Sequence, residues 1–137
     1  MTTIIATREL MVSDTKCDYH VPFRISKIFR IGDVIYGGAG STHELERFLE
    51  WKRGGEKPSL SGEEEWCVLE LSRDGLFMWM PSLTKVQIKS KFYAIGSGAQ
   101  YAIGAMECGV EPKDAIRIAA KYDSGTELPL ETMKLEG

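Results

Sequence analysis

The sequence predicts a single layered α+β domain over residues 1–137, and three observations lead to this class. A length of 137 residues suits one domain that buries roughly two thirds of the surface of its unfolded chain. The predicted elements follow in the order strands, helix, strands, two helices and strand. No internal repeat and no segment of linker composition interrupts this order.

The first third of the chain is predicted to form strands. Residues 2–7 are rich in β-branched side chains, and residues 9–16 add a second apolar run, so we expect a strand pair that ends near Asp14. Apolar and polar residues then alternate over residues 23–31, which predicts a strand that carries Lys27. After a glycine turn, a further strand follows.

Residues 41–55 show the clearest helix pattern of the chain. Ser41 or Thr42 supplies the N-cap, and Glu44 stands at capping-box spacing from Ser41. The apolar stripe of this helix consists of Leu45, Phe48, Leu49 and Trp51. Two glycines at its end stop the helix.

The middle of the chain returns to strands after a loop at residues 56–65. Residues 65–80 predict two strands around a turn at Asp74 and Gly75. Residues 84–98 continue with two more strand-like stretches before a glycine-rich turn.

Two helices and a terminal strand are predicted for the last part. The helix at residues 99–109 ends at Gly109, and Pro112 stands at the start of the helix at residues 111–123. Residues 126–137 are expected to contain one terminal strand.

Composition excludes several classes of protein. Hydrophobic residues make up 43 % and charged residues 27 %, as in globular proteins, and the longest apolar stretches are too short to cross a bilayer. The net charge of −3 without a basic block argues against nucleic-acid binding. We therefore expect neither a nucleic acid nor a membrane as a partner.

The cysteines and the start of the chain add two further expectations. The three cysteines form no CxxC pair and accompany only two histidines, which argues against a disulfide framework and a zinc site. No metal or cofactor is expected. The start lacks the long apolar run of a secretory signal, so a cytoplasmic location is expected.

Five separated residues become informative when they are taken together: Thr2, Asp14, Lys27, Gly40 and Ser97. In this order and spacing they resemble the β-type subunits of the proteasome and, more closely, the peptidase subunit of the bacterial two-component proteasome-like (HslV-type) protease. The most specific stretches are KFYAIGSGAQYAIGAM and SKIFRIGDVIYGGAGST. The resemblance implies the N-terminal nucleophile hydrolase fold, a four-layer αββα sandwich.

The resemblance also implies a mechanism for a threonine-type peptidase. A threonine hydroxyl is a poor nucleophile, and in this family the residue's own α-amino group removes its proton. The ordinary pKa of such an amine, roughly 7.7 to 8.0, suits this task. The mechanism therefore requires a free α-amine on Thr2 and hence the removal of Met1. The small side chain of Thr2 allows this removal. By the same resemblance, Lys27 supplies a positive charge beside the nucleophile, and Asp14 forms an ion pair with Lys27.

Further positions of the family's site correspond to other residues of this chain. Gly40 matches the glycine whose N–H stabilises the oxyanion, and Ser97 matches the serine that bonds the threonine amine. Asp123 and Ser124 fall where the family has a second aspartate and a serine. Cys17, Asp18 and Gly38 correspond to residues of the substrate-binding groove, and Gly38 predicts a roomy pocket.

Each residue of this set also has an ordinary structural interpretation. Alone, Lys27 reads as a solvent-facing strand lysine, Asp14 as a turn residue and Gly40 as a tight-turn glycine. The glycine-serine turn at Ser97 also suggests a phosphate cradle, but no GxxxxGK[ST] motif accompanies it.

The chain resembles a shortened form of this family, with reduced peripheral helices, because only one helix is predicted between the glycine turn and the next strands. The expected partners are a peptide or unfolded protein substrate, further copies of the chain in a ring-like homo-oligomer, and an ATPase unfoldase. Two alternatives remain open at this point. One is a non-catalytic proteasome-like ring or assembly protein with a blocked N-terminus, and the other is a hydrolase of non-peptide amides.

Overall fold

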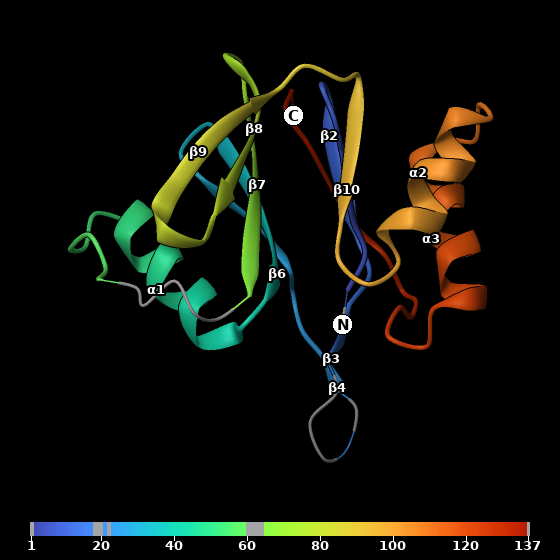
Figure 1. Ribbon diagram of the computed structural model, residues 1–137, viewed down its shortest axis with the longest axis horizontal. Coiled ribbons are helices and arrows are strands. Elements are labelled where there is room, and N and C mark those ends of the chain that lie inside the picture. Colours follow the sequence, from blue (N-terminus) through green and yellow to red (C-terminus); the bar gives the residue numbers. More distant parts are fainter. Residues whose placement is uncertain (1, 18–20, 22, 60–64, 137) are drawn as a thin grey trace.

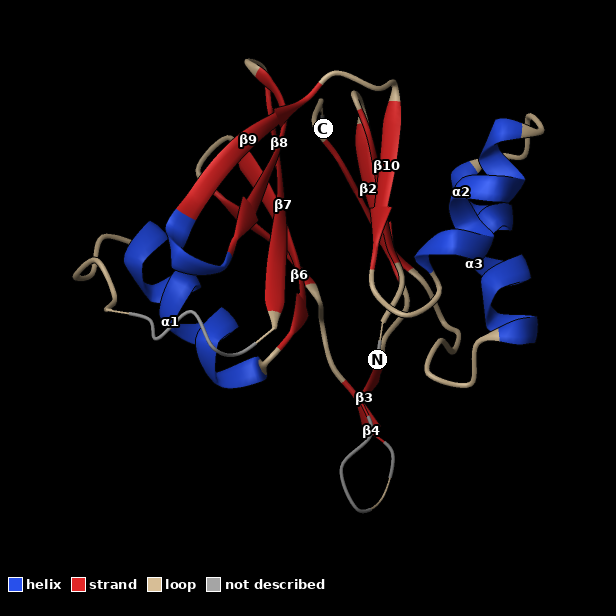
Figure 2. Ribbon diagram, in the orientation of Figure 1, coloured by secondary structure: helices blue, strands red, loops and turns tan. Residues whose placement is uncertain are grey.

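The computed structural model describes residues 2–17, 21, 23–59 and 65–136, and within them the chain alternates strands and helices as predicted (Figures 1 and 2). The elements are β1 (Ile4–Thr7), β2 (Leu10–Ser13), β3 (Lys16–Cys17), β4 (Phe23–Arg24), β5 (Ile28–Ile31), β6 (Val34–Gly40), α1 (Thr42–Lys52), β7 (Trp66–Ser72), β8 (Gly75–Met80), β9 (Thr84–Ile88), β10 (Phe92–Ile95), α2 (Ala99–Glu107), α3 (Pro112–Tyr122) and β11 (Glu131–Lys134). A 3-10 turn at Pro81–Leu83 joins β8 to β9.

The strands form two main antiparallel sheets and one short hairpin. One sheet has four strands in the order β10-β1-β2-β11, and the other has five in the order β5-β6-β7-β8-β9. The hairpin pairs β3 with β4 and projects beyond the two sheets (Figure 1). The α+β class with antiparallel sheets is therefore confirmed.

The apolar core between the two sheets holds them together. Ile4 and Met11 of the four-stranded sheet pack in one cluster with Ile28, Ile35 and Leu69 of the five-stranded sheet, and all five side chains are fully buried. Side chains alternate between the faces of a strand, so the residue next to Ile4 in β1 faces the opposite side. Each sheet thus has a second apolar face to cover.

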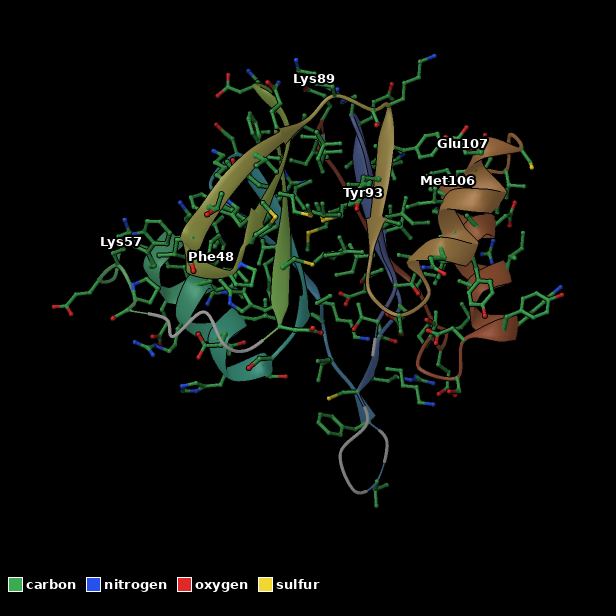
Figure 3. All side chains as sticks on the ribbon, in the orientation of Figure 1. Phe48, Lys57, Lys89, Tyr93, Met106 and Glu107 are labelled. Atoms are coloured by element: carbon green, nitrogen blue, oxygen red, sulfur yellow. The ribbon has the colours of Figure 1, made fainter. Side chains whose placement is uncertain are left out.

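Helices cover these outer faces. Phe48 of α1 packs on the outer face of the five-stranded sheet with Val68 and Trp79. On the other side, Met106 of α2 packs in a second cluster with Ile5 of the four-stranded sheet. Figure 1 shows α1 on one side of the molecule and the pair α2 and α3 on the other, and Figure 3 labels Phe48 and Met106 on these two sides.

Most predicted boundaries agree with the structure. Ser41 caps α1 by accepting the N–H of Glu44, Gly75 adopts a positive φ in the β7–β8 turn, and Gly109 does so just after α2. Pro112 begins α3.

The prediction that Lys27 lies on a regular strand is wrong. Residues 25–27 lie between β4 and β5 outside regular strand structure. They are held by isolated backbone bonds, from the N–H of Ile25 to Thr15 and from the N–H of Gly38 to Lys27. This irregular segment lets the Lys27 side chain turn inward, where it is 5 % exposed.

Candidate active site

Thr2 lies just before β1 and is held by the turn that follows β10. Its N–H donates to Ser97 Oγ at 3.2 Å, and its carbonyl oxygen accepts the N–H of Gly98 at 3.3 Å. Gly96 adopts a φ of +99°, and a Cβ at this position would lie 2.1 Å from the Thr2 carbonyl oxygen. The turn can approach Thr2 this closely because residue 96 has no side chain.

A buried ion pair lies one strand away from Thr2. Lys27 Nζ donates to both carboxylate oxygens of Asp14, at 3.0 and 3.1 Å. The Asp14 carboxylate also accepts the backbone N–H groups of Thr3, Lys16 and Glu127 at 3.0, 3.3 and 3.2 Å. Asp14 is fully buried, so these donors replace the water that the charge loses on folding.

Ser97 connects Thr2 to a second carboxylate. Its hydroxyl donates to Asp123 Oδ2 at 2.7 Å, and Thr126 Oγ1 donates to the same oxygen at 2.6 Å. Partial burial raises the pKa of Asp123, but the hydrogen bonds from Thr126, Ser97 and the backbone of Gly125 outweigh it, so the pKa lies below its usual value. Asp123 is thus held as a carboxylate next to the residue that bonds Thr2.

Thr126 contacts Asp123 and was not named among the residues expected from the sequence. Ser124, which was assigned to this part of the site, is exposed, and its described contact is through its carbonyl oxygen, which accepts Lys16 Nζ at 2.8 Å. The hydroxyl that bonds Asp123 comes instead from Thr126, two residues later. The hydroxyl-bearing residues within three positions of Asp123 are Tyr122, Ser124 and Thr126, so sequence spacing alone does not single out Thr126.

Gly40 ends β6 at the rim of the site. It adopts a φ of +112°, and a Cβ there would fall 2.4 Å from the carbonyl oxygen of Glu65. This position therefore requires glycine. Gly40 lines two cavities that Thr2 also lines.

The first of these cavities has a volume of about 230 Å³ and is lined by five of the ten predicted residues. Thr2 and Lys27 both line it, although they are 25 positions apart in the sequence. Cys17 and Gly38, two of the predicted substrate-binding residues, line it as well. The third, Asp18, lies outside the described residues.

The second cavity, about 420 Å³, lies on the side of Ser97 and includes Trp66 and Cys67. Burial raises the pKa of the Cys67 thiol to about 11. At neutral pH this thiol is protonated, which makes it a poor nucleophile.

Over residues 2–17, 21, 23–59 and 65–136, no three His, Cys, Asp or Glu side chains are grouped so that they could hold a metal ion. Within the same part of the chain, no helix has the length and apolar character needed to span a membrane.

The sequence matches no protein-family model and no curated protein. Solved structures, in contrast, resemble it from end to end. BPH of Thiobacillus denitrificans, in complex with epoxomicin, has a TM-score of 0.73 at 21 % identity, and the match covers 99 % of this chain and 99 % of that one. Eukaryotic HslV from Trypanosoma brucei has a TM-score of 0.71 at 20 % identity, with 96 % and 98 % covered.

A more distant similarity leads to the Anbu proteins. Anbu of Pseudomonas aeruginosa, solved as a helical assembly, has a TM-score of 0.69 at 12 % identity, and the match covers 96 % of this chain and 80 % of that one. At these identities the similarity establishes the fold. The resemblance seen in the sequence is thus confirmed at that level: this chain has the fold of the HslV-type proteasome-like peptidases.

Proposed function

We propose that this chain is a threonine-type endopeptidase of the proteasome family, with Thr2 as its N-terminal nucleophile once Met1 has been removed. The observation that carries the proposal is the shared cavity of Thr2 and Lys27, because a buried ammonium group that lines the same cavity as a hydroxyl favours the deprotonated form of that hydroxyl. Asp14 holds that ammonium in place through two hydrogen bonds. The proposed architecture is the four-layer αββα sandwich of N-terminal nucleophile hydrolases.

The proposed reaction has two steps. The free α-amine of Thr2 takes the proton of Thr2 Oγ1 as this oxygen attacks the peptide carbonyl carbon, and the same proton passes to the leaving nitrogen when the C–N bond breaks. An ester between substrate and Thr2 remains. Water then loses a proton to the amine as it attacks the ester carbonyl carbon. This proton passes to Thr2 Oγ1 when the bond between that oxygen and the acyl carbon breaks, which releases the second product and restores the free threonine.

The remaining site residues receive roles from their positions. The N–H of Gly40, at the rim of both cavities, is proposed to donate to the carbonyl oxygen as it becomes an oxyanion. Ser97 accepts an N–H of Thr2, and Asp123 accepts the Ser97 hydroxyl. The roles of Ser124 and Asp18 stay predictions from the resemblance.

The cavity of about 230 Å³ is proposed to receive a substrate side chain next to the cleaved bond. Ile25 and Leu45 give it apolar lining, and Lys16 and Cys17 line it as well. A Cβ at Gly38 would lie 2.8 Å from Leu45 Cδ2, so the lack of a side chain at Gly38 leaves room for the Leu45 side chain in the cavity wall. The substrate would be a peptide or an unfolded protein.

The assembly is part of the proposal. A homo-oligomer, ring-like as in the resembled family, would enclose the site, and an ATPase unfoldase would supply unfolded chains from the cytoplasm. The structure of the Pseudomonas Anbu protein is itself described as a helical assembly, which favours self-association in proteins of this fold.

One experiment tests the catalytic assignment. Protein whose Met1 is shown by intact mass to be absent should cleave short fluorogenic peptides, and Thr2→Ala should lower kcat/KM by at least about a thousandfold because the nucleophile is gone. Thr2→Ser keeps a hydroxyl and should retain measurable activity. Epoxomicin, bound in the Thiobacillus structure, should inhibit the wild type.

The outcome also separates the alternatives. Peptide cleavage that survives Thr2→Ala would overturn the proposal. Met1 retained in protein from the native source, without Thr2-dependent activity, would favour the non-catalytic ring or assembly protein. Cleavage of small amides but not of peptides would favour a non-peptide amidase.

A further inference from the structure

A chain of hydroxyl hydrogen bonds connects the residue after Thr2 to Asp123. Thr3 Oγ1 and Thr126 Oγ1 are 2.6 Å apart, and Thr126 Oγ1 donates to Asp123 Oδ2 at 2.6 Å. Ser97 Oγ donates to the same carboxylate oxygen at 2.7 Å. Thr3 is fully buried and Thr126 is 4 % exposed. The connection is thus closed off from bulk water on the Thr3 side.

The direction of these bonds follows from proton counting. A hydroxyl has one proton, and an ionised carboxylate only accepts. Since Thr126 gives its proton to Asp123, the proton in the contact with Thr3 must come from Thr3. Ser97 also gives its proton to Asp123, because its other acceptor, the Thr2 carbonyl oxygen, is farther away at 3.4 Å. Ser97 Oγ is then an acceptor for the N–H of Thr2.

Thr3 is also tied to the ion pair on the other side of the site. Its N–H donates to Asp14 Oδ1 at 3.0 Å, and its carbonyl oxygen accepts the N–H of Asp14 at 3.2 Å. A Cβ at Gly98 would lie 2.0 Å from Thr3 Oγ1, so the glycine leaves the space that the hydroxyl occupies. Thr3 therefore links both carboxylates of the site, one residue away from the proposed nucleophile.

We propose that Thr3 is a positioning residue, whose hydroxyl holds Thr126 and Asp123 in the orientation that keeps Ser97 an acceptor for the Thr2 nitrogen. This inference rests on the proposed function of Thr2. An amine that donates one N–H to Ser97 has its lone pair directed away from that serine. The lone pair is then available for the proton of the Thr2 hydroxyl.

The variant Thr3→Val tests the hydroxyl at constant side-chain shape. We expect kcat to fall roughly three- to tenfold, the effect of one hydrogen bond, while KM stays within about twofold. Thr3→Ser restores the hydroxyl and should recover most of kcat. The matched control is Thr15→Val, since Thr15 is 6 % exposed and its hydroxyl donates to the Pro129 carbonyl oxygen at 2.9 Å, outside this chain of bonds.

A second pair of variants tests whether the bonds act in series. Thr126→Val breaks the chain between Thr3 and Asp123, so kcat should be lowered in this variant too. In that background Thr3→Val should cause no further loss of kcat. An additive loss would show that Thr3 acts by another route and would overturn the inference.

An NMR titration of Asp123 supplies a readout without activity. Loss of a donor raises the pKa of a carboxylate, so Thr126→Val should raise that of Asp123, and Thr3→Val should raise it by less. Among the described residues, the other charged side chains around the site are those of Asp14, Lys16, Arg24, Lys27, Glu65 and Glu127, and the positive charge of the chain's amino group also lowers the pKa of Asp123. All of these groups are unchanged in these variants and in the control Thr15→Val.

The two proposals fail in different ways. Inactive wild-type protein without Met1 would refute the proposed function and leave the Asp123 titration to decide the role of Thr3. An active wild type with an equally active Thr3→Val variant would refute the positioning role alone. If the wild type is inactive, an unchanged pKa of Asp123 in Thr3→Val would likewise refute the positioning role of Thr3.

Discussion

At the scale of residues, Asp14 shows how a charge can be kept inside this protein. It is fully buried, yet three backbone N–H groups and the Lys27 ammonium donate to its carboxylate. Lys27 is 5 % exposed, so both charges have left water. Such a pair is costly to form and more costly to break, because removal of one partner leaves the other charge buried without compensation.

The variant Lys27→Met keeps a long side chain but removes the ammonium. We expect it to lower the free energy of unfolding by about 3 kcal/mol, since the Asp14 carboxylate stays buried without its cation. Peptidase activity should also be lost. Urea unfolding followed by tryptophan fluorescence measures the first effect.

A surface ion pair provides the control for this variant. Arg117 Nη1 and Asp114 Oδ1 are 2.7 Å apart, but their side chains are 52 % and 61 % exposed. Arg117→Met should therefore cost below about 1 kcal/mol. Equal losses for the two variants would contradict the importance assigned to the buried pair. The double variant Asp14→Asn with Lys27→Met, which removes both charges, should recover part of the stability that Lys27→Met alone loses.

At the scale of elements, one edge of the candidate active site is formed by the turns at the ends of β6 and β10 rather than by the strands themselves. Each turn contains a glycine with positive φ, Gly40 or Gly96, at which a Cβ would collide with backbone atoms. Both glycines line the cavity of about 420 Å³ next to Thr2. Close approach of backbone to backbone, rather than side-chain packing, therefore defines this edge of the site.

Gly96→Ala tests that view. The new methyl group would lie 2.1 Å from the Thr2 carbonyl oxygen, so Thr2 must move away from Ser97. We expect a loss of stability of roughly 1–3 kcal/mol from strain and a large loss of kcat. Activity assays and thermal unfolding measure the two effects.

Variants at two other glycines separate the effect of backbone strain from the effect of the close approach to Thr2. Gly109 has a φ of +91° with nothing within 4 Å of an added Cβ, so Gly109→Ala reports backbone strain alone. Gly104 lies within α2 with open space around it, and Gly104→Ala should stabilise the protein by about 0.5–1 kcal/mol. Both variants should keep wild-type kcat. If Gly96→Ala is also fully active, the close approach is not needed for catalysis.

At the scale of the whole molecule, the two sheets and their covering helices leave the site near one end. The N-terminus and the β3–β4 hairpin lie at the same end of the molecule (Figure 1). Two large apolar side chains that line one cavity there are exposed: Phe23 on β4 and Leu128, at 48 % and 43 %. Exposed apolar groups of this kind occur where protein surfaces meet.

We therefore expect a homo-oligomer in solution. Native mass spectrometry should give a mass that is a multiple of the 15.3 kDa chain, and light scattering over a dilution series should give the same stoichiometry at micromolar concentration. Thr2→Ala, which leaves the surface unchanged, should assemble like the wild type. A chain that stays at 15.3 kDa at these concentrations would contradict the proposed assembly.

Much of this fold follows from local patterns in the sequence. Alternation predicted the strands, the stripe around Phe48 predicted α1, and Gly109 and Pro112 marked the helix ends, because these signals depend on neighbours within a few residues. The combination of Thr2, Asp14, Lys27, Gly40 and Ser97 predicted the fold through a resemblance, which the structural comparisons confirm at that level.

Only the tertiary structure decided which side chains meet. Thr2 and Ser97 bond across 95 positions, and Thr3 and Thr126 across 123. These contacts depend on how β1 pairs with β10 and on where the segment after α3 returns to the sheet, and local periodicity carries no information on either. Sequence spacing named Ser124 near Asp123, whereas the hydroxyl of Thr126 is the one that bonds the Asp123 carboxylate in the structure. Local patterns determined the elements, and packing over long separations determined the site.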